Sequence, residues 1–231
     1  MKIDYKLKTI VPWGRNLEEY RQIFSLGEED LKKRILGCGD GPSSFNAELT
    51  TLGGDVVSID SIYQFSKEEL SSRIDEVAIE VMEMVRKNSS GFVWKSIKNP
   101  DELEQIRMSA MRVFLNDYKE GLKQKRYRFE MLPSLSFKEK SFDLALSSHF
   151  LFLYSEHLDF EFHISAILEM LRVADEVRIF PLKTLENVYS PHLKKVQEVL
   201  EKKGYNSEIV KTEYEFQQGA DEFLKVYYGT N

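Results

Sequence analysis

The chain has 231 residues, of which 42% are hydrophobic and 30% charged, as in soluble globular proteins that are long enough to bury a core. The formal net charge is −6 and the charges are interspersed, so the one-sided basic footprint of a nucleic-acid-binding protein is absent. The densest basic stretch, residues 119–128, also contains Glu120 and hydrophobic residues. We interpret it as a solvated helix face rather than a polyanion contact.

Cys38 is the single cysteine, which excludes an internal disulfide and favours a reducing compartment. No run of about 18 apolar residues occurs, and residues 1–12 lack the apolar stretch of a signal peptide. We therefore expect a cytoplasmic protein without a membrane span. The oligomeric state is not indicated.

The amino-terminal part predicts alternating helices and strands. The helices are recognised by apolar residues at helical spacing, and the strands by short β-branched runs. In chain order these are a helix over 16–31, a strand at 35–36, a helix over 43–51 and a strand over 55–60. The first strand stops at a glycine-rich turn, Gly-Cys-Gly-Asp-Gly-Pro over 37–42.

A long helical stretch follows the second strand. Two helices are predicted, over 66–87 and 101–125, with Asn99 as the cap of the second and Pro100 in its first turn. About 60 residues is far more than a usual crossover between parallel strands. We interpret the stretch as an insertion, whose helices either widen the core or roof a pocket.

The carboxyl-terminal part predicts five more strands and two helices. The strands are 127–131, 141–148, 176–180, 207–216 and 222–228, and the helices end at about 173 and at 203. The last two strands are joined by Gln217-Gln218-Gly219, and this short connection predicts an antiparallel hairpin. Together these elements predict one α/β domain over 1–231, with a mostly parallel sheet covered on both faces.

Two features point to a nucleoside ligand. Glycines in the turn after the first strand let the backbone approach a ligand closely. Asp60 lies at the end of the second strand, about 20 residues beyond the turn, where a carboxylate can accept both ribose hydroxyls. Taken separately, the turn can be a tight connection and Asp60 a helix cap. Their spacing favours the nucleoside interpretation.

Several segments resemble class I S-adenosylmethionine-dependent methyltransferases. Residues 135–146 read LSFKEKSFDLAL, like that family's LPF…SFD passage before its fourth strand. Residues 169–173 read EMLRV, and 203–205 read KGY, like its E-h-x-R-V-L and AGF segments. The resemblance implies a Rossmann-like, seven-stranded, mostly parallel sheet with a terminal antiparallel hairpin, interrupted here by the insertion between strands 2 and 3. It also implies S-adenosylmethionine as cofactor and S-adenosylhomocysteine as product.

The first motif departs from the family's V-L-D-x-G-x-G pattern. One register would bury Lys33 and Arg34 in the first strand, at a cost of several kcal/mol without partners. The other places Ile35 and Leu36 in the core and Gly37 where the family has an acid. We prefer the second register. The motif acid is missing in both.

Asp40 is the only carboxylate in the glycine-rich loop, and we expect it to take over part of the missing acid's role. The position that contacts the adenine amine in the family falls on Met131, with Glu130 beside it. The backbone at Leu132 is the alternative contact.

The cofactor site implied by the resemblance combines the glycine turn with the ends of neighbouring strands. Its residues are Gly37, Gly39, Asp40, Gly41, Asp60, Ser61, Ile62, Leu132 and Ser148. His149 follows the fourth strand and is the candidate base or substrate ligand, although it can equally be a histidine hydrogen-bonded within its loop. Secondary candidates are Tyr154, His157, Tyr189 and His192. The four histidines and one cysteine show no metal-ligand spacing, so no metal site is predicted.

The predicted function is methyl transfer from S-adenosylmethionine to an unidentified, small-molecule acceptor. An NAD-linked oxidoreductase is the enzyme alternative, and Pro42 in the last glycine place of G-x-G-x-x-G disfavours it. A non-catalytic module that binds the cofactor or a partner is the other alternative, because the first-motif acid is missing.

Overall fold

The computed structural model describes residues 11–229 as a seven-stranded sheet with helices around it. The strands are β1 Arg34–Cys38, β2 Asp55–Ile59, β3 Tyr127–Arg128, β4 Phe142–Ser148, β5 Ala174–Phe180, β6 Tyr205–Lys211 and β7 Glu222–Tyr228. The α-helices are α1 Leu17–Phe24, α2 Phe45–Thr51, α3 Lys67–Lys87, α4 Pro100–Lys123, α5 Phe160–Val173 and α6 Leu193–Lys202. No helix within this part of the chain is long and apolar enough to cross a membrane. Residues 1–10, most of the segment predicted to lack a signal peptide, lie outside the described residues.

The strand order is β3-β2-β1-β4-β5-β7-β6. β7 is antiparallel to both β5 and β6, and the pairs from β3 to β5 are all parallel. This topology confirms the predicted Rossmann-like, mostly parallel sheet with a reversed last strand. The order places β1 and β4 side by side at the centre, so the loops that follow them meet at one edge.

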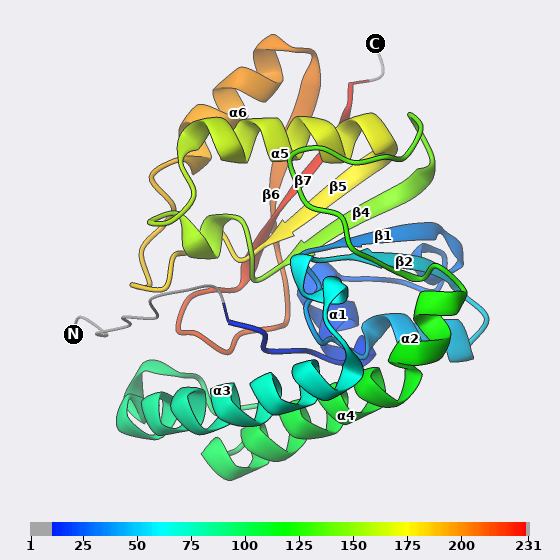
Figure 1. Ribbon diagram of the computed structural model, residues 1–231. Helices are drawn as coiled ribbons and strands as arrows, with labels where there is room; N and C mark the ends of the chain where they lie inside the picture. The colour runs from blue at the N-terminus through cyan, green and yellow to red at the C-terminus, as the bar shows by residue number, and fades with distance from the viewer. Residues whose placement is uncertain (1–10, 230–231) are drawn as a thin grey trace.

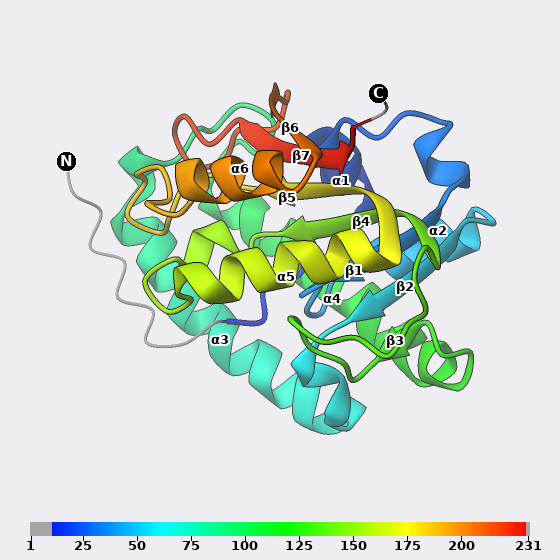
Figure 2. The same ribbon diagram turned by 90° about the horizontal axis from the view of Figure 1, so that it is seen from above.

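Helices cover both faces of the sheet (Figures 1 and 2). Leu36 belongs to the apolar cluster that β4 and β5 form with α5 and α6. Its neighbour Ile35 belongs to the cluster of α1 and α2 on the opposite face. Both side chains are fully buried because successive residues of a strand point to opposite faces. The preferred register of β1 is therefore confirmed, with Arg34 exposed at the start of the strand.

The insertion consists of the packed helices α3 and α4, which Figure 1 shows as a layer at the bottom of the molecule, opposite α5 and α6. Ser66 begins α3 with a capping box, and the Asn99 side chain accepts the N–H of Glu102 at the start of α4, where Pro100 occupies the first turn as predicted. Apolar residues on one side of α3 are buried: Ile74, Val77, Val81 and Val85.

Two segments that carry the family resemblance contact each other. Arg172 donates hydrogen bonds to the backbone oxygens of Phe137, at 2.9 Å, and Leu135, at 3.1 Å. Glu169 accepts the N–H of Leu135 at 2.7 Å. The end of α5 thus holds the loop that leads into β4, which explains why these motifs occur together.

Two predicted elements are shorter in the structure. The first helix was predicted to reach residue 31 but ends at Phe24, because Ser25 adopts a left-handed conformation with φ 51° and stops it. The third strand was predicted to reach Met131, but β3 ends at Arg128. The next residues leave the sheet as Glu130 turns its carboxylate toward Arg128, at 2.5 Å.

The terminal hairpin is antiparallel as predicted, but the predicted tight connection is wrong. The strand expected over 207–216 ends at Lys211, so the connection runs from 212 to 221. The physical reason is a competing partner for the backbone: the oxygen of Phe216 accepts the N–H of Val93 in the insertion, at 2.8 Å. The connection is therefore drawn toward α3 and α4 rather than into the sheet.

Candidate functional site

A cavity of about 420 Å³ lies at the carboxyl ends of β1, β2, β4 and β5. Residues from the loops after these strands line it, together with parts of the insertion and of the β6–β7 connection. The lining includes nearly all of the predicted cofactor and catalytic residues: Gly39, Asp40, Gly41, Asp60, Ser61, Ile62, Leu132, Ser148 and His149. The fold therefore brings together residues that are spread over 110 positions of the sequence, from Gly39 to His149.

The glycine-rich turn is held against β2. Gly39 and Gly41 have φ of 69° and 57°, in the left-handed region that glycine adopts without strain. The ring of Phe150 lies so close to Gly39 that a Cβ there would be 2.9 Å from it. The N–H of Gly39 donates to the backbone oxygen of Ile59 at 2.9 Å, and the N–H of Gly41 donates to Oδ2 of Asp60 at 2.8 Å. The turn and the acid that the sequence paired by spacing are thus in direct contact.

Asp60 lines the cavity and also caps a short helical turn. Its Oδ1 accepts the N–H of Ile62 at 2.9 Å, while Oδ2 accepts that of Gly41. Burial raises the pKa of Asp60 above its ordinary value, and the backbone N–H donors oppose that rise. The helix-cap interpretation of Asp60 is therefore confirmed, whereas the nucleoside interpretation stays a prediction.

Asp40 is almost fully buried beside the turn. Its carboxylate accepts hydrogen bonds from the Tyr20 hydroxyl at 2.8 Å and the Ser58 hydroxyl at 2.5 Å. Burial raises the pKa of Asp40 to about 7, although these two donors lower it. Gly37, predicted as a cofactor contact, does not line the cavity, because the Asp40 carboxylate lies against it.

His149 directly follows β4 in a left-handed conformation, with φ 55°, and lines the cavity. The backbone N–H of His149 donates to the backbone oxygen of Phe180 at 2.6 Å. The Nδ1 atom of its ring shares a hydrogen bond of 2.9 Å with the Ser148 hydroxyl. Burial, followed by the nearby guanidinium groups of Arg15 and Arg107, lowers the pKa of His149 well below its ordinary value. The imidazole is therefore neutral at pH 7 and has a lone pair to accept a proton.

Only one of the four secondary candidates lines the cavity. Tyr154 lines the cavity, and its hydroxyl accepts the N–H of Val11 at 3.4 Å. His157, Tyr189 and His192 do not line it; the Tyr189 hydroxyl instead donates to Glu222 at 2.6 Å. Among residues 11–229, no group of three or more His, Cys, Asp and Glu side chains is arranged to hold a metal ion.

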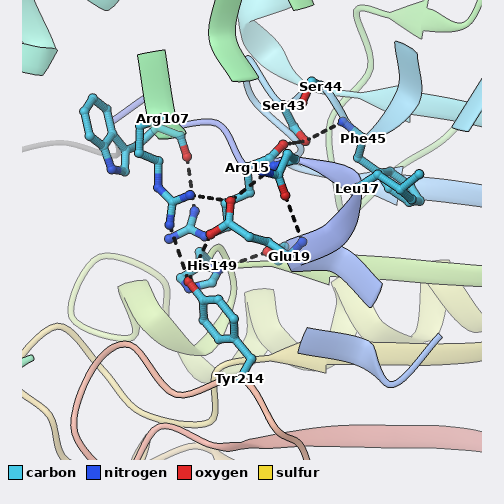
Figure 3. Close-up of polar contacts among 12 residues, drawn as sticks. Arg15, Leu17, Glu19, Ser43, Ser44, Phe45, Arg107, His149 and Tyr214 are labelled. Atoms are coloured by element: carbon cyan, nitrogen blue, oxygen red, sulfur yellow. Dashed lines mark hydrogen bonds and ion pairs between the residues drawn. The ribbon is translucent and has the colours of Figure 1, made fainter. Parts of the chain in front are cut away.

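A charged cluster that sequence reasoning missed closes one side of the cavity (Figure 3). Arg107 from α4 forms an ion pair with Glu19 from α1, and its Nη2 donates to the Tyr214 hydroxyl at 3.4 Å. Arg15, just before α1, extends toward the same group, and His149 lies beside it. These residues belong to four separate segments, so no motif or spacing in the sequence announces the cluster.

One curated protein resembles the chain over nearly its whole length. The chain is 36% identical over 222 residues to the uncharacterized protein MJ0045 of Methanocaldococcus jannaschii, covering 94% of this chain and 96% of that protein. This chain belongs to the MJ0045 family. No protein-family model matches the sequence.

Solved structures with the same general architecture share little sequence with this member of the MJ0045 family. A TehB-like SAM-dependent methyltransferase from Corynebacterium glutamicum is 16% identical, with a TM-score of 0.49 and coverage of 92% of this chain and 87% of that one. A SAM-dependent methyltransferase from Methanosarcina mazei is 16% identical, with a TM-score of 0.47 and coverage of 89% and 95%. Magnesium protoporphyrin IX methyltransferase from Synechocystis, solved with bound SAM, is 13% identical, with a TM-score of 0.45 and coverage of 92% and 90%.

Proposed function

We propose that the chain binds S-adenosylmethionine in the cavity and transfers its methyl group to a small-molecule acceptor. One observation carries the proposal: the glycine turn after β1 is hydrogen-bonded through Gly41 to Asp60 at the end of β2, and both line the same cavity. In open α/β sheets, nucleotide-like ligands bind in this place.

The volume of the cavity and the residues that line it support this proposal. Asp60 is positioned to accept the ribose hydroxyls, and the apolar side chains of Ile62 and Leu132 are available to the adenine. The carboxylates that line this side, Asp40, Asp60 and Glu130, suit a ligand that carries a sulfonium and an ammonium group. A volume of about 420 Å³ lies within the usual range for small-molecule sites, from about 300 to 1,000 Å³.

When bound, the cofactor supplies an electrophilic methyl group on a sulfonium. The chain's own residues orient the acceptor, exclude water and receive a proton. Apolar side chains from the insertion, Val81, Met84, Val85 and Leu103, form a wall of the cavity that keeps water out. His149 is the candidate base, because it lines the cavity directly after β4.

A cofactor-binding module without turnover is the second candidate. It is favoured by Gly37, which leaves the turn without an acid at the family's position and makes Asp40 the carboxylate there. An NAD-linked oxidoreductase is disfavoured by Pro42, which replaces the last glycine of the dinucleotide-binding turn.

Cys38 is buried and free within β1, which supports a location in a reducing compartment such as the cytoplasm.

We also propose that residues 1–231 form one domain.

Isothermal titration calorimetry tests the proposal. We expect S-adenosylmethionine and S-adenosylhomocysteine to bind with one site per chain, and NAD⁺ to bind at least about a hundredfold more weakly. Tight NAD⁺ binding without adenosylhomocysteine binding would favour the oxidoreductase. Binding of neither ligand would refute a nucleoside site.

A further inference from the structure

The charged residues that line the cavity are divided between its two sides. Asp40, Asp60 and Glu130 lie at β1, β2 and the segment after β3, on one side of the sheet centre. Arg15 and Arg107 lie with His149 and Tyr214, which follow β4 and β6 on the other side. A cationic cofactor is attracted to the acidic side, so the arginines face the space left for the acceptor.

Arg107 is buried, and one of its side-chain N–H groups has no hydrogen-bond partner among the described residues. Only 1% of its surface is exposed, and the N–H group in question is that of Nε. Its single carboxylate partner, Glu19, is shared: Glu19 also accepts the backbone N–H of Asn16 at 3.3 Å and the Tyr214 hydroxyl at 3.3 Å. Because its Nε is itself buried, Arg107 contributes positive charge to the cavity wall rather than an exposed donor.

Arg15 is the second cation and forms no ion pair within the described part of the chain. Its Nη1 donates to the backbone oxygen of Trp13 at 3.1 Å, and its Nε is buried without a partner among residues 11–229. Burial, followed by the neighbouring guanidinium of Arg107, lowers the pKa of Arg15, while Tyr214 and Glu19 oppose that shift. Glu19 therefore pairs with Arg107 and lies near Arg15, which has no ion-pair partner of its own among residues 11–229.

We propose that Arg15 and Arg107 bind an anionic group, a carboxylate or a phosphate, on the methyl acceptor. The proposal rests on the proposed function, because it assigns the acidic side of the cavity to the cofactor. An anion here neutralises the surplus positive charge and can contact the guanidinium of Arg15, which is partly exposed and lines the cavity. Tyr214 and Phe216 from the β6–β7 connection, with Met84 and Leu103 from the insertion, offer apolar surface to the rest of the molecule. The acceptor is therefore a small amphiphilic anion.

The test uses benzoate and phenyl phosphate as probes, titrated into the full-length chain saturated with S-adenosylhomocysteine. We expect both probes to bind, and benzamide, the neutral counterpart of benzoate, to bind at least about tenfold more weakly. Arg15→Gln should weaken binding of the anions at least about tenfold, while Arg86→Gln should leave it unchanged. Arg86 is the matched control, because it is an exposed arginine paired with Asp101 and Glu104 on the surface.

Arg107→Gln alone would leave Glu19 buried without its partner, so Arg107 is tested in the double variant Glu19→Gln/Arg107→Gln, checked for folding by its melting temperature. We expect this variant also to lose anion binding at least about tenfold. Equal affinity for benzoate and phenyl phosphate in the wild type, Arg15→Gln and the double variant would overturn the proposal. So would failure of both probes to bind the wild-type complex.

The cofactor's own carboxylate is a second source of an anion, and another pair of titrations separates it. S-adenosylhomocysteine carries a carboxylate, whereas 5′-methylthioadenosine does not. Unchanged binding of both in Arg15→Gln supports the acceptor site. If Arg15→Gln weakens only S-adenosylhomocysteine, the arginines bind the cofactor and the proposal is overturned. Failure of the wild type to bind either nucleoside would instead refute the proposed function.

Discussion

The carboxylate of Asp40 occupies the space in which a side chain of Gly37 would lie. A Cβ on Gly37 would fall 1.8 Å from Oδ2 of Asp40, and the hydroxyls of Tyr20 and Ser58 hold that carboxylate in place. The family resemblance puts an acid at position 37, and here the acid comes from three residues further along the chain. The Asp40 carboxylate can therefore occupy this position only because residue 37 has no side chain.

The first prediction concerns the stability of this pair. Gly37→Ala should destabilise the fold by about 1–3 kcal/mol, because the new Cβ displaces the Asp40 carboxylate from its two hydroxyl donors. In an Asp40→Gly background the same substitution should cost much less, since the clash is gone. A double-mutant cycle by chemical denaturation measures the difference. Equal costs in the two backgrounds would show that the two residues are not coupled.

The second prediction concerns cofactor affinity. Asp40→Asn should weaken S-adenosylhomocysteine binding more than Asp55→Asn, because Asp40 lines the cavity while Asp55 is an exposed residue at the far end of β2. Calorimetry on both variants is the measurement. If they bind alike, Asp40 is only a structural residue of the turn.

The third prediction is a pH dependence of stability. Burial raises the pKa of Asp40 from its ordinary 3.8 to about 7, so between these values the folded chain binds more protons than the unfolded chain. The contribution of Asp40 to stability therefore declines as pH rises through this window. Relative to Asp40→Asn, the wild type should lose about 2–3 kcal/mol between pH 5 and pH 8. Parallel melting curves of both proteins across this range would contradict the shift.

The fourth prediction concerns the ribose site. Asp60→Ala should lose at least about tenfold in affinity for S-adenosylhomocysteine, as expected when a charge-assisted hydrogen-bond pair is removed. Because Asp60 also holds the N–H groups of Gly41 and Ile62, Asp60→Asn is the second variant, which keeps an acceptor for one of them. Unchanged affinity in both variants would remove Asp60 from the site.

The fifth prediction concerns the insertion. Val81, Met84 and Val85 on α3, with Leu103 and Arg107 on α4, line the cavity, which favours the hypothesis that the helices roof the pocket over the hypothesis that they only widen the core. Hydrogen exchange with and without S-adenosylhomocysteine should show protection that spreads into residues 66–125. Protection confined to the glycine turn and the surroundings of Asp60 would leave the insertion as scaffold.

The sheet and the side of the cavity formed by the glycine turn and Asp60 were predictable because their signals are local. The runs around Ile35 and Val57 mark buried strands, and the glycine turn and Asp60 lie at the ends of consecutive strands. Parallel strands must bring such ends to one edge, so spacing along the chain already implies contact in space. The ends of elements were less predictable: α1 stops at a left-handed Ser25, and the backbone of Phe216 pairs with the insertion instead of extending β6.

The sequence by itself determined the fold class, the order of elements and the residues of the glycine turn, since each depends on a short-range periodicity or spacing. Only the tertiary structure decided that Arg107, in the middle of a helical insertion, meets Glu19, Tyr214 and Arg15. In sequence, Arg107 is 88 residues from Glu19 and 107 from Tyr214, and the contact exists because α4 packs over the carboxyl edge of the sheet. A charge on a helix is ordinarily solvated, and nothing in its neighbours along the chain reveals that packing will bury it.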